Sequence, residues 1–530
     1  MFAIPLKPLK ARIHVFFSFF LILFCSPVLC GTVNSEPEVN GSLTYLWPLP
    51  TEFTSGNETL SVDPGLSLIG AGNGGNSAIV RAAFDRYKGI IFKHTTGVSP
   101  FSLLRGKRPV YDITRLRIVV DSDSEDLQLG VDESYTLYVA KNDGQSIIGE
   151  VTIEANTVYG ALRGLETFSQ LCTFDYGSKS VLVYQAPWYI QDKPRFSFRG
   201  LLLDTSRHYL PIDVIKQIID SMSYAKLNVL HWHVIDEQSF PIEIPSYPNL
   251  WRGAYTKWER YTIEDAIEIV KGKGYPDLWP NSTCREPLDV SKNYTFDVIT
   301  GILTDMRKIF PFELFHLGGD EVNTGCWNST PHVKQWLQDK NITTKEAYQY
   351  FVLRAQEIAL SKNWTPVNWE ETFNTFAENL HPKTVVHNWL GPGVCPKAVA
   401  KGFRCIFSNQ GVWYLDHLDV PWNEFYTAEP LEGINDASQQ KLVLGGEVCM
   451  WAETADTSNV QQTIWPRAAA AAERLWSKEV AISTGNINET ALPRLHYFRC
   501  LLNRRGVQAA PLTNKLARTP PNGPGSCFEQ

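Results

Sequence analysis

The stretch ELFHLGGDE, at residues 313–321, decides the fold: a short apolar run ends in two glycines and two adjacent acids. The apolar run has the composition of a buried strand. The glycines permit a sharp turn, because glycine adopts backbone conformations that other residues avoid. Asp320 and Glu321 therefore follow the carboxyl end of a strand. Two adjacent acids on one turn at this position indicate a chemical role.

Six other stretches repeat this pattern of an apolar run followed by polar residues. They read FRGLLLDTSR (198–207), NVLHWHVIDEQ (228–238), TPVNWEE (365–371), TVVHNWL (384–390), FRCIFSN (403–409) and KLVLGGEVCMW (441–451). Helix-like runs occur near 211–225, 295–309 and 345–362 and after 458. Continuous apolar strands that alternate with helices are typical of a parallel sheet buried on both faces. We therefore predict a (β/α)₈ TIM-type barrel, whose active site lies at the carboxyl ends of its strands.

The strand count falls one short of eight. Between a helix predicted near 262–271 and the helix predicted to begin near 295, the chain reads GKGYPDLWPNSTCREPLDVSKNY (272–294). This stretch contains no β-branched apolar run of strand length. The sequence therefore predicts seven strands, with the third strand of the barrel missing.

The barrel is expected over residues 191–530, after a small α+β domain over 31–190 and a signal peptide over 1–30. Strand-like runs at 115–120 and 133–139 and a helical run at 155–171 indicate the α+β domain. The signal peptide is indicated by Arg12, the apolar run 16–24 and the small residues that follow. Because no Ala-x-Ala cleavage site is present, an uncleaved membrane anchor stays open.

Composition narrows the ligand class. The net charge is −7 and becomes more negative once the N-terminus is removed, which excludes an electrostatic hold on nucleic acid. The 16 Trp residues suit the C–H faces of sugars. Eight Asn-x-Ser/Thr sequons fit a glycoprotein of the secretory pathway, vacuolar or extracellular: Asn40, Asn57, Asn281, Asn293, Asn328, Asn341, Asn363 and Asn488.

The cysteines and histidines do not form a recognisable metal motif. Two of ten cysteines fall within the signal peptide, and the other eight lack Cys-x-x-Cys spacing, which excludes a zinc ribbon. They allow a few disulfides, whose pairing stays open. His231 and His233 have the spacing of a metal pair, but without a third ligand we expect hydrogen-bonded histidines. No metal and no cofactor is predicted.

Charged and aromatic residues gather where the predicted strands end. Together they describe a carbohydrate pocket. The candidates are Arg207, Asp236, Asp320, Glu321, Trp369, Trp389, Tyr414, Asp416, Trp451 and Glu453.

Several motifs together resemble the β-N-acetylhexosaminidases of glycoside hydrolase family twenty, particularly the plant members. They are RGLLLDTSRHYLP, NVLHWHVIDEQSFP, ELFHLGGDEV, WEE, GGEVCMW and IWPRAAAAAERLWS. The resemblance spans residues 43 to 527. It implies an exo-acting hydrolase that removes terminal β-linked GlcNAc or GalNAc from N-glycans or chitooligosaccharides without a metal, and it leaves a homodimer open.

The resemblance also implies roles for individual residues. Glu321 matches the general acid/base, Asp320 the acid that orients the 2-acetamido group, and Tyr414 the hydrogen-bond donor to its carbonyl. The sugar itself then supplies the nucleophile, so Asp320 should be ionised while Glu321 is buried and protonated. The other matches are to sugar-binding groups: Arg207, Asp236, Asp416 and Glu453 as polar contacts, and Trp369, Trp389 and Trp451 as aromatic walls. By the same resemblance, Cys284 pairs with Cys326 and Cys500 with Cys527.

The chain departs from the family where the strand count falls short. Family members carry a strand and a pocket loop with an acidic-x-Pro-Gly-His motif before GYPDLWP, whereas this chain runs directly from EIVKGKG into it. A catalytically impaired or unstable form that at most binds amino sugars is therefore one alternative. A retaining glycosidase with Glu453 or Glu370 as nucleophile is another.

Overall fold

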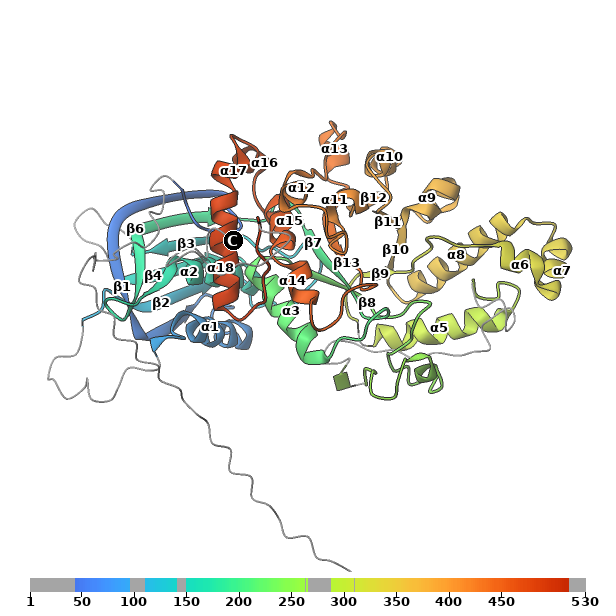
Figure 1. The fold of residues 1–530 in the computed structure, drawn as a ribbon, viewed down its shortest axis with the longest axis horizontal. Helices are drawn as coiled ribbons and strands as arrows, with labels where there is room; N and C mark the ends of the chain where they lie inside the picture. The colour runs from blue at the N-terminus through green and yellow to red at the C-terminus, as the bar shows by residue number, and fades with distance from the viewer. Residues whose placement is uncertain are drawn as a thin grey trace, which may run out of the picture.

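The computed structural model describes residues 43–95, 110–140, 149–262, 264–265, 287–308 and 310–513. These residues form two separate sheets, one of six strands and one of seven (Figure 1). The predicted signal peptide, the helix predicted over 262–271 and the cysteines Cys284 and Cys527 lie largely or wholly outside the described residues.

The N-terminal sheet has the strand order β1-β2-β4-β3-β6-β5. Its longest strand, β1, pairs in parallel with β2 and antiparallel with β6. Helices α1 and α2 pack against each other, and the hydroxyls of Ser77 and Thr157 cap their first turns. The elements are β1 (Glu52–Ala71), α1 (Ala78–Ile91), β2 (Ile113–Val120), β3 (Tyr135–Val139), β4 (Glu150–Ala155), α2 (Val158–Leu171), β5 (Cys172–Asp175) and β6 (Ser180–Asp192).

The second sheet is parallel throughout, with the order β8-β7-β13-β12-β11-β10-β9. Its strands match the seven predicted apolar runs. They are β7 (Phe198–Asp204), β8 (Val229–His233), β9 (Leu314–His316), β10 (Thr365–Trp369), β11 (Val385–Asn388), β12 (Arg404–Phe407) and β13 (Val443–Met450). The predicted fold class, a TIM-type barrel short of one strand and preceded by a small α+β domain, is confirmed.

Helices lie between consecutive barrel strands and also follow the last strand, outside the sheet (Figure 1). The longer ones are α3 (Ile212–Tyr224), α5 (Asn293–Arg307), α7 (Pro331–Lys340), α8 (Thr344–Ser361), α15 (Arg467–Trp476) and α18 (Leu492–Arg504). The shorter ones are η3 (Leu250–Gly253), α6 (Gly325–Ser329), α9 (Glu370–Phe376), η5 (Ala377–Asn379), α10 (Val394–Ala400), α11 (Gln410–Trp413), α12 (Trp422–Thr427), α13 (Ala437–Gln440), α14 (Val460–Ile464), α16 (Glu479–Ile482) and α17 (Ile487–Thr490).

Among the described residues, no strand joins β8 to β9, and this opening is called the gap in the barrel below. These two strands end the sheet on either side, and among the described residues between them only an isolated bridge, Ile242 to Tyr261, has β pairing. Every residue of β8 and β9 is partly exposed, whereas every residue of β7, β10 and β11 is buried. The gap therefore lies where the sequence predicts the missing third strand.

A tryptophan from each half of the chain packs in the hydrophobic core of the other half. Trp47, which precedes β1, packs in the core of the barrel and donates its indole N–H to the carbonyl of Ala469 at 3.0 Å. Trp476, at the end of α15, packs in the core of the N-terminal sheet and donates to both carboxylate oxygens of Asp192 at 3.0 Å. Each core is therefore completed by a residue of the other.

Buried ion pairs also join the sheets. The guanidinium of Arg199, on β7, is fully buried and bonds the carboxylate of Glu133 at 2.6 and 2.8 Å. Lys226, which follows α3, bonds Asp192 at 2.8 Å. A buried charge is tolerated only when it is paired, so each of these partners depends on the other.

One disulfide is described in full, between Cys395 and Cys405. Cys326 and Cys500 are also disulfide-bonded, but their expected partners Cys284 and Cys527 lie outside the described residues. Cys172 and Cys449 are free thiols. In the described part of the chain, no helix is both long and apolar enough to span a bilayer.

Candidate active site

All ten predicted site residues lie at or just beyond the carboxyl ends of barrel strands, the end at which barrel enzymes carry their chemistry. Contacts between side chains link six of them: Arg207, Asp236, Trp369, Tyr414, Trp451 and Glu453. A ring contact with Tyr414 adds Trp389. Asp320, Glu321 and Asp416 join the group through the electrostatic interactions described below.

Arg207 is the centre of a charged cluster. Its Nη2 lies 2.9 Å from Asp236, its Nη1 lies 3.4 Å from Asp204, and its Nε lies 3.9 Å from Glu453. The guanidinium also lies over the ring of Trp451, 5.1 Å from its centre. The buried Nε has no hydrogen-bond partner in the described structure, so one donor is left for a ligand.

His233 belongs to the same cluster and was not among the predicted site residues. Its Nε2 lies 2.7 Å from Asp236, and its ring meets Trp451 edge-on at 4.8 Å. Burial opposes the ionisation of Asp236, but the hydrogen bond from His233 and the charges of His233 and Arg207 hold the pKa of Asp236 below its usual value. His233 is thus hydrogen-bonded, as predicted from the sequence.

The turn that carries the two acids is held by the neighbouring strand. Gly318 and Gly319 have φ angles of 68° and 100°, the left-handed region that suits glycine. The carbonyl of Gly318 accepts hydrogen bonds from the backbone and the side chain of β10, and Tyr348 donates to the carbonyl of Gly319 at 2.5 Å. Glu321 also has a positive φ, 48°, which non-glycine residues adopt at a cost of about 1–3 kcal/mol.

The two acids differ in their surroundings. Asp320 is partly buried, and burial together with the charges of Asp236 and Glu321 raises its pKa. Glu321 is exposed, so the expectation that burial keeps it protonated is wrong for this structure. The reason lies in the fold, because Glu321 follows β9, one of the two strands that border the gap in the barrel.

Aromatic rings form the walls of the site. Trp389 lies nearly parallel to Tyr414, with ring centres 6.4 Å apart and an angle of 14°. Trp451 lies 6.1 Å from Tyr414 and 6.2 Å from Trp369. Burial raises the pKa of Tyr414, and the neighbouring Cys449 adds a smaller effect in the same direction. The hydroxyl of Tyr414 therefore keeps its proton and can donate a hydrogen bond.

Asp416 follows β12 at the same end of the barrel. Burial raises the pKa of its carboxyl, and the charge of Glu453 acts in the same direction. Its buried Oδ1 has no hydrogen-bond partner among the described residues. Together with the unpaired Nε of Arg207, this atom fits a site built for a polar, hydroxyl-rich ligand.

Glu371 was not among the predicted site residues. Its two carboxylate oxygens lie 3.0 and 3.1 Å from the indole nitrogen of Trp389. Burial, with the charges of Asp320 and Glu370, raises the pKa of Glu371 to about 7. The repeated acid in WEE is the one signal in the sequence that could have drawn attention to it.

A histidine cluster lies in the barrel interior beneath Trp369. His387 stacks on Trp369 at 4.3 Å, and His231 bonds the fully buried Glu447 at 2.9 Å. Potential ligand atoms of His231, His387 and Glu447 lie within 4.8 Å of one another. Burial lowers the pKa of His316 and His387 well below the usual value, so both rings are neutral hydrogen-bonding groups that support the wall.

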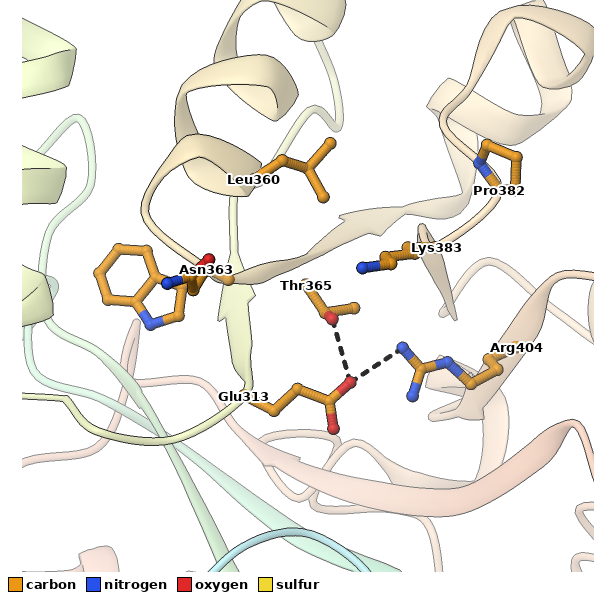
Figure 2. A pocket seen from close by; sticks show the side chains of 8 residues that line it. Glu313, Leu360, Asn363, Thr365, Pro382, Lys383 and Arg404 are labelled. Carbon is orange, nitrogen blue, oxygen red and sulfur yellow. Dashed lines mark hydrogen bonds and ion pairs between the residues drawn. The ribbon is translucent and has the colours of Figure 1, made fainter.

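A cavity of about 470 Å³ lies at the opposite end of the barrel. Figure 2 shows Glu313 pointing toward Thr365 and Arg404, to which it is hydrogen-bonded at 3.0 and 3.2 Å. These residues stand at or next to the starts of β9, β10 and β12. Features at this end of a barrel contribute to stability rather than to chemistry, so the cavity is not the active site.

Two family models match the chain. A model described as "Glycosyl hydrolase family 20, catalytic domain" matches residues 196–274 and 272–479, and one described as "beta-acetyl hexosaminidase like" matches residues 46–171. The first match is broken at residues 272–274. This break coincides with the place where the sequence lacks a third strand.

Named relatives cover nearly the whole chain. Beta-hexosaminidase 1 of Arabidopsis thaliana is 71% identical over 534 aligned positions, which cover 96% of this chain and 98% of that protein. Because this alignment is longer than the chain, it contains gaps within this sequence, opposite residues of the relative. Beta-hexosaminidase 3 of the same plant is 49% identical, with coverages of 95% and 97%.

Solved structures share the fold. The structure of the chitobiase of Flavobacterium johnsoniae superposes with a TM-score of 0.73 at 26% identity, and covers 89% of this chain and 74% of that one.

Proposed function

This chain belongs to glycosyl hydrolase family 20, and we propose that it is an exo-β-N-acetylhexosaminidase that releases terminal β-linked GlcNAc or GalNAc from N-glycans or chitooligosaccharides. One observation carries the proposal. Asp320 and Glu321 follow each other on a fixed turn, at the end of the barrel where aromatic rings and the Arg207 cluster gather.

The proposed reaction uses the substrate as its own nucleophile. The oxygen of the 2-acetamido group attacks C1, the glycosidic bond breaks, and Glu321 donates a proton to the leaving oxygen. Water then opens the oxazolinium-type intermediate with Glu321 acting as the base. The exposed position of Glu321 gives water and an aglycone access to it.

Asp320 and Tyr414 act on the acetamido group. Ionised Asp320 orients the amide N–H and stabilises the positive charge that develops on the nitrogen. Because the pKa of Asp320 is raised, this role requires a pH above that raised value. Tyr414 keeps its proton and donates to the amide carbonyl as the oxygen attacks.

The remaining residues hold the sugar. Arg207, with its free Nε donor, and Asp416, with its free Oδ1 acceptor, bind hydroxyl groups. Glu453 binds a hydroxyl beside Arg207, and Asp236 keeps the guanidinium in place. Trp369, Trp389 and Trp451 enclose the ring and the acetamide.

The structure argues against a carboxylate nucleophile. Glu370 is buried, and its Oε2 accepts hydrogen bonds from the Asn388 side chain and from two backbone N–H groups at 2.6, 2.7 and 3.1 Å. These bonds commit Oε2 to holding the chain that follows β11, and Oε1 accepts a hydrogen bond from Asn374 at 3.3 Å. Glu453 lies 3.9 Å from Arg207, within the cluster proposed to bind hydroxyl groups. The similarity to named hexosaminidases over most of the chain also speaks against a form that only binds sugars.

The test compares nitrophenyl glycosides of GlcNAc, GalNAc and glucose. We expect turnover of the first two and none of the third, because only the N-acetyl sugars carry the nucleophile. A thiazoline analogue of the cyclised sugar should inhibit competitively. Efficient cleavage of the glucoside, or a glycosyl ester trapped on a side chain, would contradict the proposal.

We also propose that the chain enters the secretory pathway and resides in the vacuole or outside the cell. The apolar run near the N-terminus and the eight sequons support this. The described sequon asparagines are all exposed: Asn57, Asn293, Asn328, Asn341, Asn363 and Asn488. N-terminal sequencing and a mass shift on glycosidase treatment test the route. Gel filtration with light scattering tests the homodimer that the family resemblance leaves open.

A further inference from the structure

Two consecutive carboxylates hold one aromatic wall of the site. Glu370 and Glu371 begin α9, directly after the wall residue Trp369. Glu370 fixes the backbone that follows β11 through the N–H groups of Trp389 and Leu390. Glu371 fixes the side chain, because both of its oxygens lie within 3.1 Å of the indole nitrogen of Trp389. The backbone and the ring of Trp389 are thus held separately.

The ring that Glu371 holds faces the tyrosine proposed to bind the acetamide. Trp389 and Tyr414 lie 14° from parallel, and Trp389 is only partly buried. Packing alone therefore leaves the indole some freedom to rotate. A hydrogen bond to its N–H is what restricts the ring to one orientation.

Glu371 is also part of the electrostatics of the catalytic turn. Its charge interacts with that of Asp320, which contributes to the raised pKa of Glu371, and with Tyr348, which bonds the carbonyl of Gly319. The carboxyl of Glu371 therefore interacts both with the wall residue Trp389 and with the turn that carries Asp320. Glu371 has none of the roles that are assigned above to other residues.

We propose that Glu371 is a positioning residue that sets the orientation of Trp389 and thereby the size of N-acyl group that the enzyme accepts. The inference rests on the proposed function, because the acyl group is taken to lie against this wall. Without the hydrogen bond, the indole can turn away from Tyr414 and leave room for a longer acyl chain.

The kinetic test uses nitrophenyl glycosides that carry N-acetyl or N-propionyl groups. Glu371→Gln keeps an acceptor for the indole N–H, so we expect its preference for N-acetyl to stay within about twofold of the unmodified enzyme. Glu371→Ala should raise KM for the N-acetyl substrate and reduce the N-acetyl preference about tenfold, the effect of one lost hydrogen bond. Glu432→Gln, an exposed carboxylate remote from these contacts, is the matched control.

A second measurement does not depend on turnover. The indole N–H resonance of Trp389, assigned by its loss in Trp389→Phe, should move and exchange faster with solvent in Glu371→Ala but not in Glu371→Gln. If the unmodified enzyme fails to cleave either glycoside but the resonance behaves in this way, the proposed function fails while the positioning role stands.

The double variant Glu371→Ala/Trp389→Phe separates a shared role from two independent ones. If Glu371 acts through the indole N–H, the double variant should show no loss beyond Trp389→Phe alone. Unchanged acyl preference and an unmoved indole resonance in Glu371→Ala would overturn the inference. Fully additive losses in the double variant would overturn it as well.

Discussion

The imidazole rings of His231 and His316 stack with their centres 4.8 Å apart and 22° between their planes, although the strands that carry them are not hydrogen-bonded to each other. His231 lies on β8 and His316 on β9, on opposite sides of the gap in the barrel. Side chains thus meet inside the barrel where the described backbones do not. Contacts of this kind replace little of the stability that a strand provides.

Restoring the missing strand should therefore stabilise the enzyme. We expect insertion of the family segment after Lys271 to raise the free energy of unfolding by at least about 3 kcal/mol, because several ladder hydrogen bonds each contribute roughly 0.5–1.5 kcal/mol. Turnover of the GlcNAc glycoside should rise as well. Urea denaturation measures the first effect, with a Gly/Ser insertion of equal length as the control. Equal stability and turnover of the two forms would refute the prediction.

Substitution of either Asp320 or Glu321 should remove most of the activity, but for a different reason in each case. Glu321→Gln should lower kcat by about 10²–10⁴-fold, the usual contribution of a general acid, and less for substrates with a good leaving group. Asp320→Asn should lower kcat by about 10²–10³-fold for every leaving group, because it weakens charge stabilisation. Asp297→Asn, an exposed acid on α5, is the control. Activity near that of the control in either variant would rule out the assigned role.

Arg207→Lys should impair binding although the charge is kept. A lysine ammonium cannot contact Asp236, approach Glu453 and lie over Trp451 at the same time, as the planar guanidinium does. We expect KM for the GlcNAc glycoside to rise about tenfold or more, which corresponds to roughly 1.4 kcal/mol. Arg354→Lys, in an exposed ion pair on α8, serves for comparison. An unchanged KM would mean that Arg207 does not touch the sugar.

Glu133→Gln should destabilise the junction between the two sheets. It leaves the fully buried Arg199 without its counter-charge, and breaking such a pair typically costs about 3–5 kcal/mol. The loss should appear as a lower urea midpoint at neutral pH. Glu125→Gln, on the surface of the same domain, should have no effect. A change no larger than that of the control would show that water reaches Arg199.

The same pair makes a prediction about pH. Burial opposes ionisation of Glu133, but the charges of Arg163 and Arg199 lower its pKa from 4.5 to about 2. A carboxyl whose pKa is lower in the folded than in the unfolded protein stabilises the fold at every pH above its unfolded-state pKa. This stabilisation is lost as the pH falls toward its folded-state pKa. The difference between the unmodified protein and Glu133→Gln should therefore be constant above about pH 5.5 and shrink between pH 4.5 and 2.

Local patterns in the sequence predicted the secondary structure of the barrel well. The helices expected near 211–225 and 345–362 are found at Ile212–Tyr224 and Thr344–Ser361. Each is amphipathic and clearly bounded, and Thr343 and Glu346 form a capping box at the start of the second. The long strand β1 was not predicted, because its exposed polar residues hide the alternation that marks a strand.

The site was predictable only where its residues end strands. Arg207 and Trp451 follow apolar runs, so their position alone marks them. Glu371 bonds Trp389, 18 residues further along the chain, and His233 contacts Trp451 in addition to its near neighbour Asp236. No local pattern reports such long-range contacts. The exposure of Glu321 depends on what borders β9, which is a property of the assembled barrel.

Trp47 packs in the core of the barrel and Trp476 in the core of the N-terminal sheet, and this arrangement determines how the protein unfolds on heating. Neither half can lose its shape without pulling an indole out of the other and exposing a large apolar surface. The protein should therefore show one heat-absorption peak in scanning calorimetry rather than two. For the same reason, neither half is a self-sufficient module that could be cut out and transplanted.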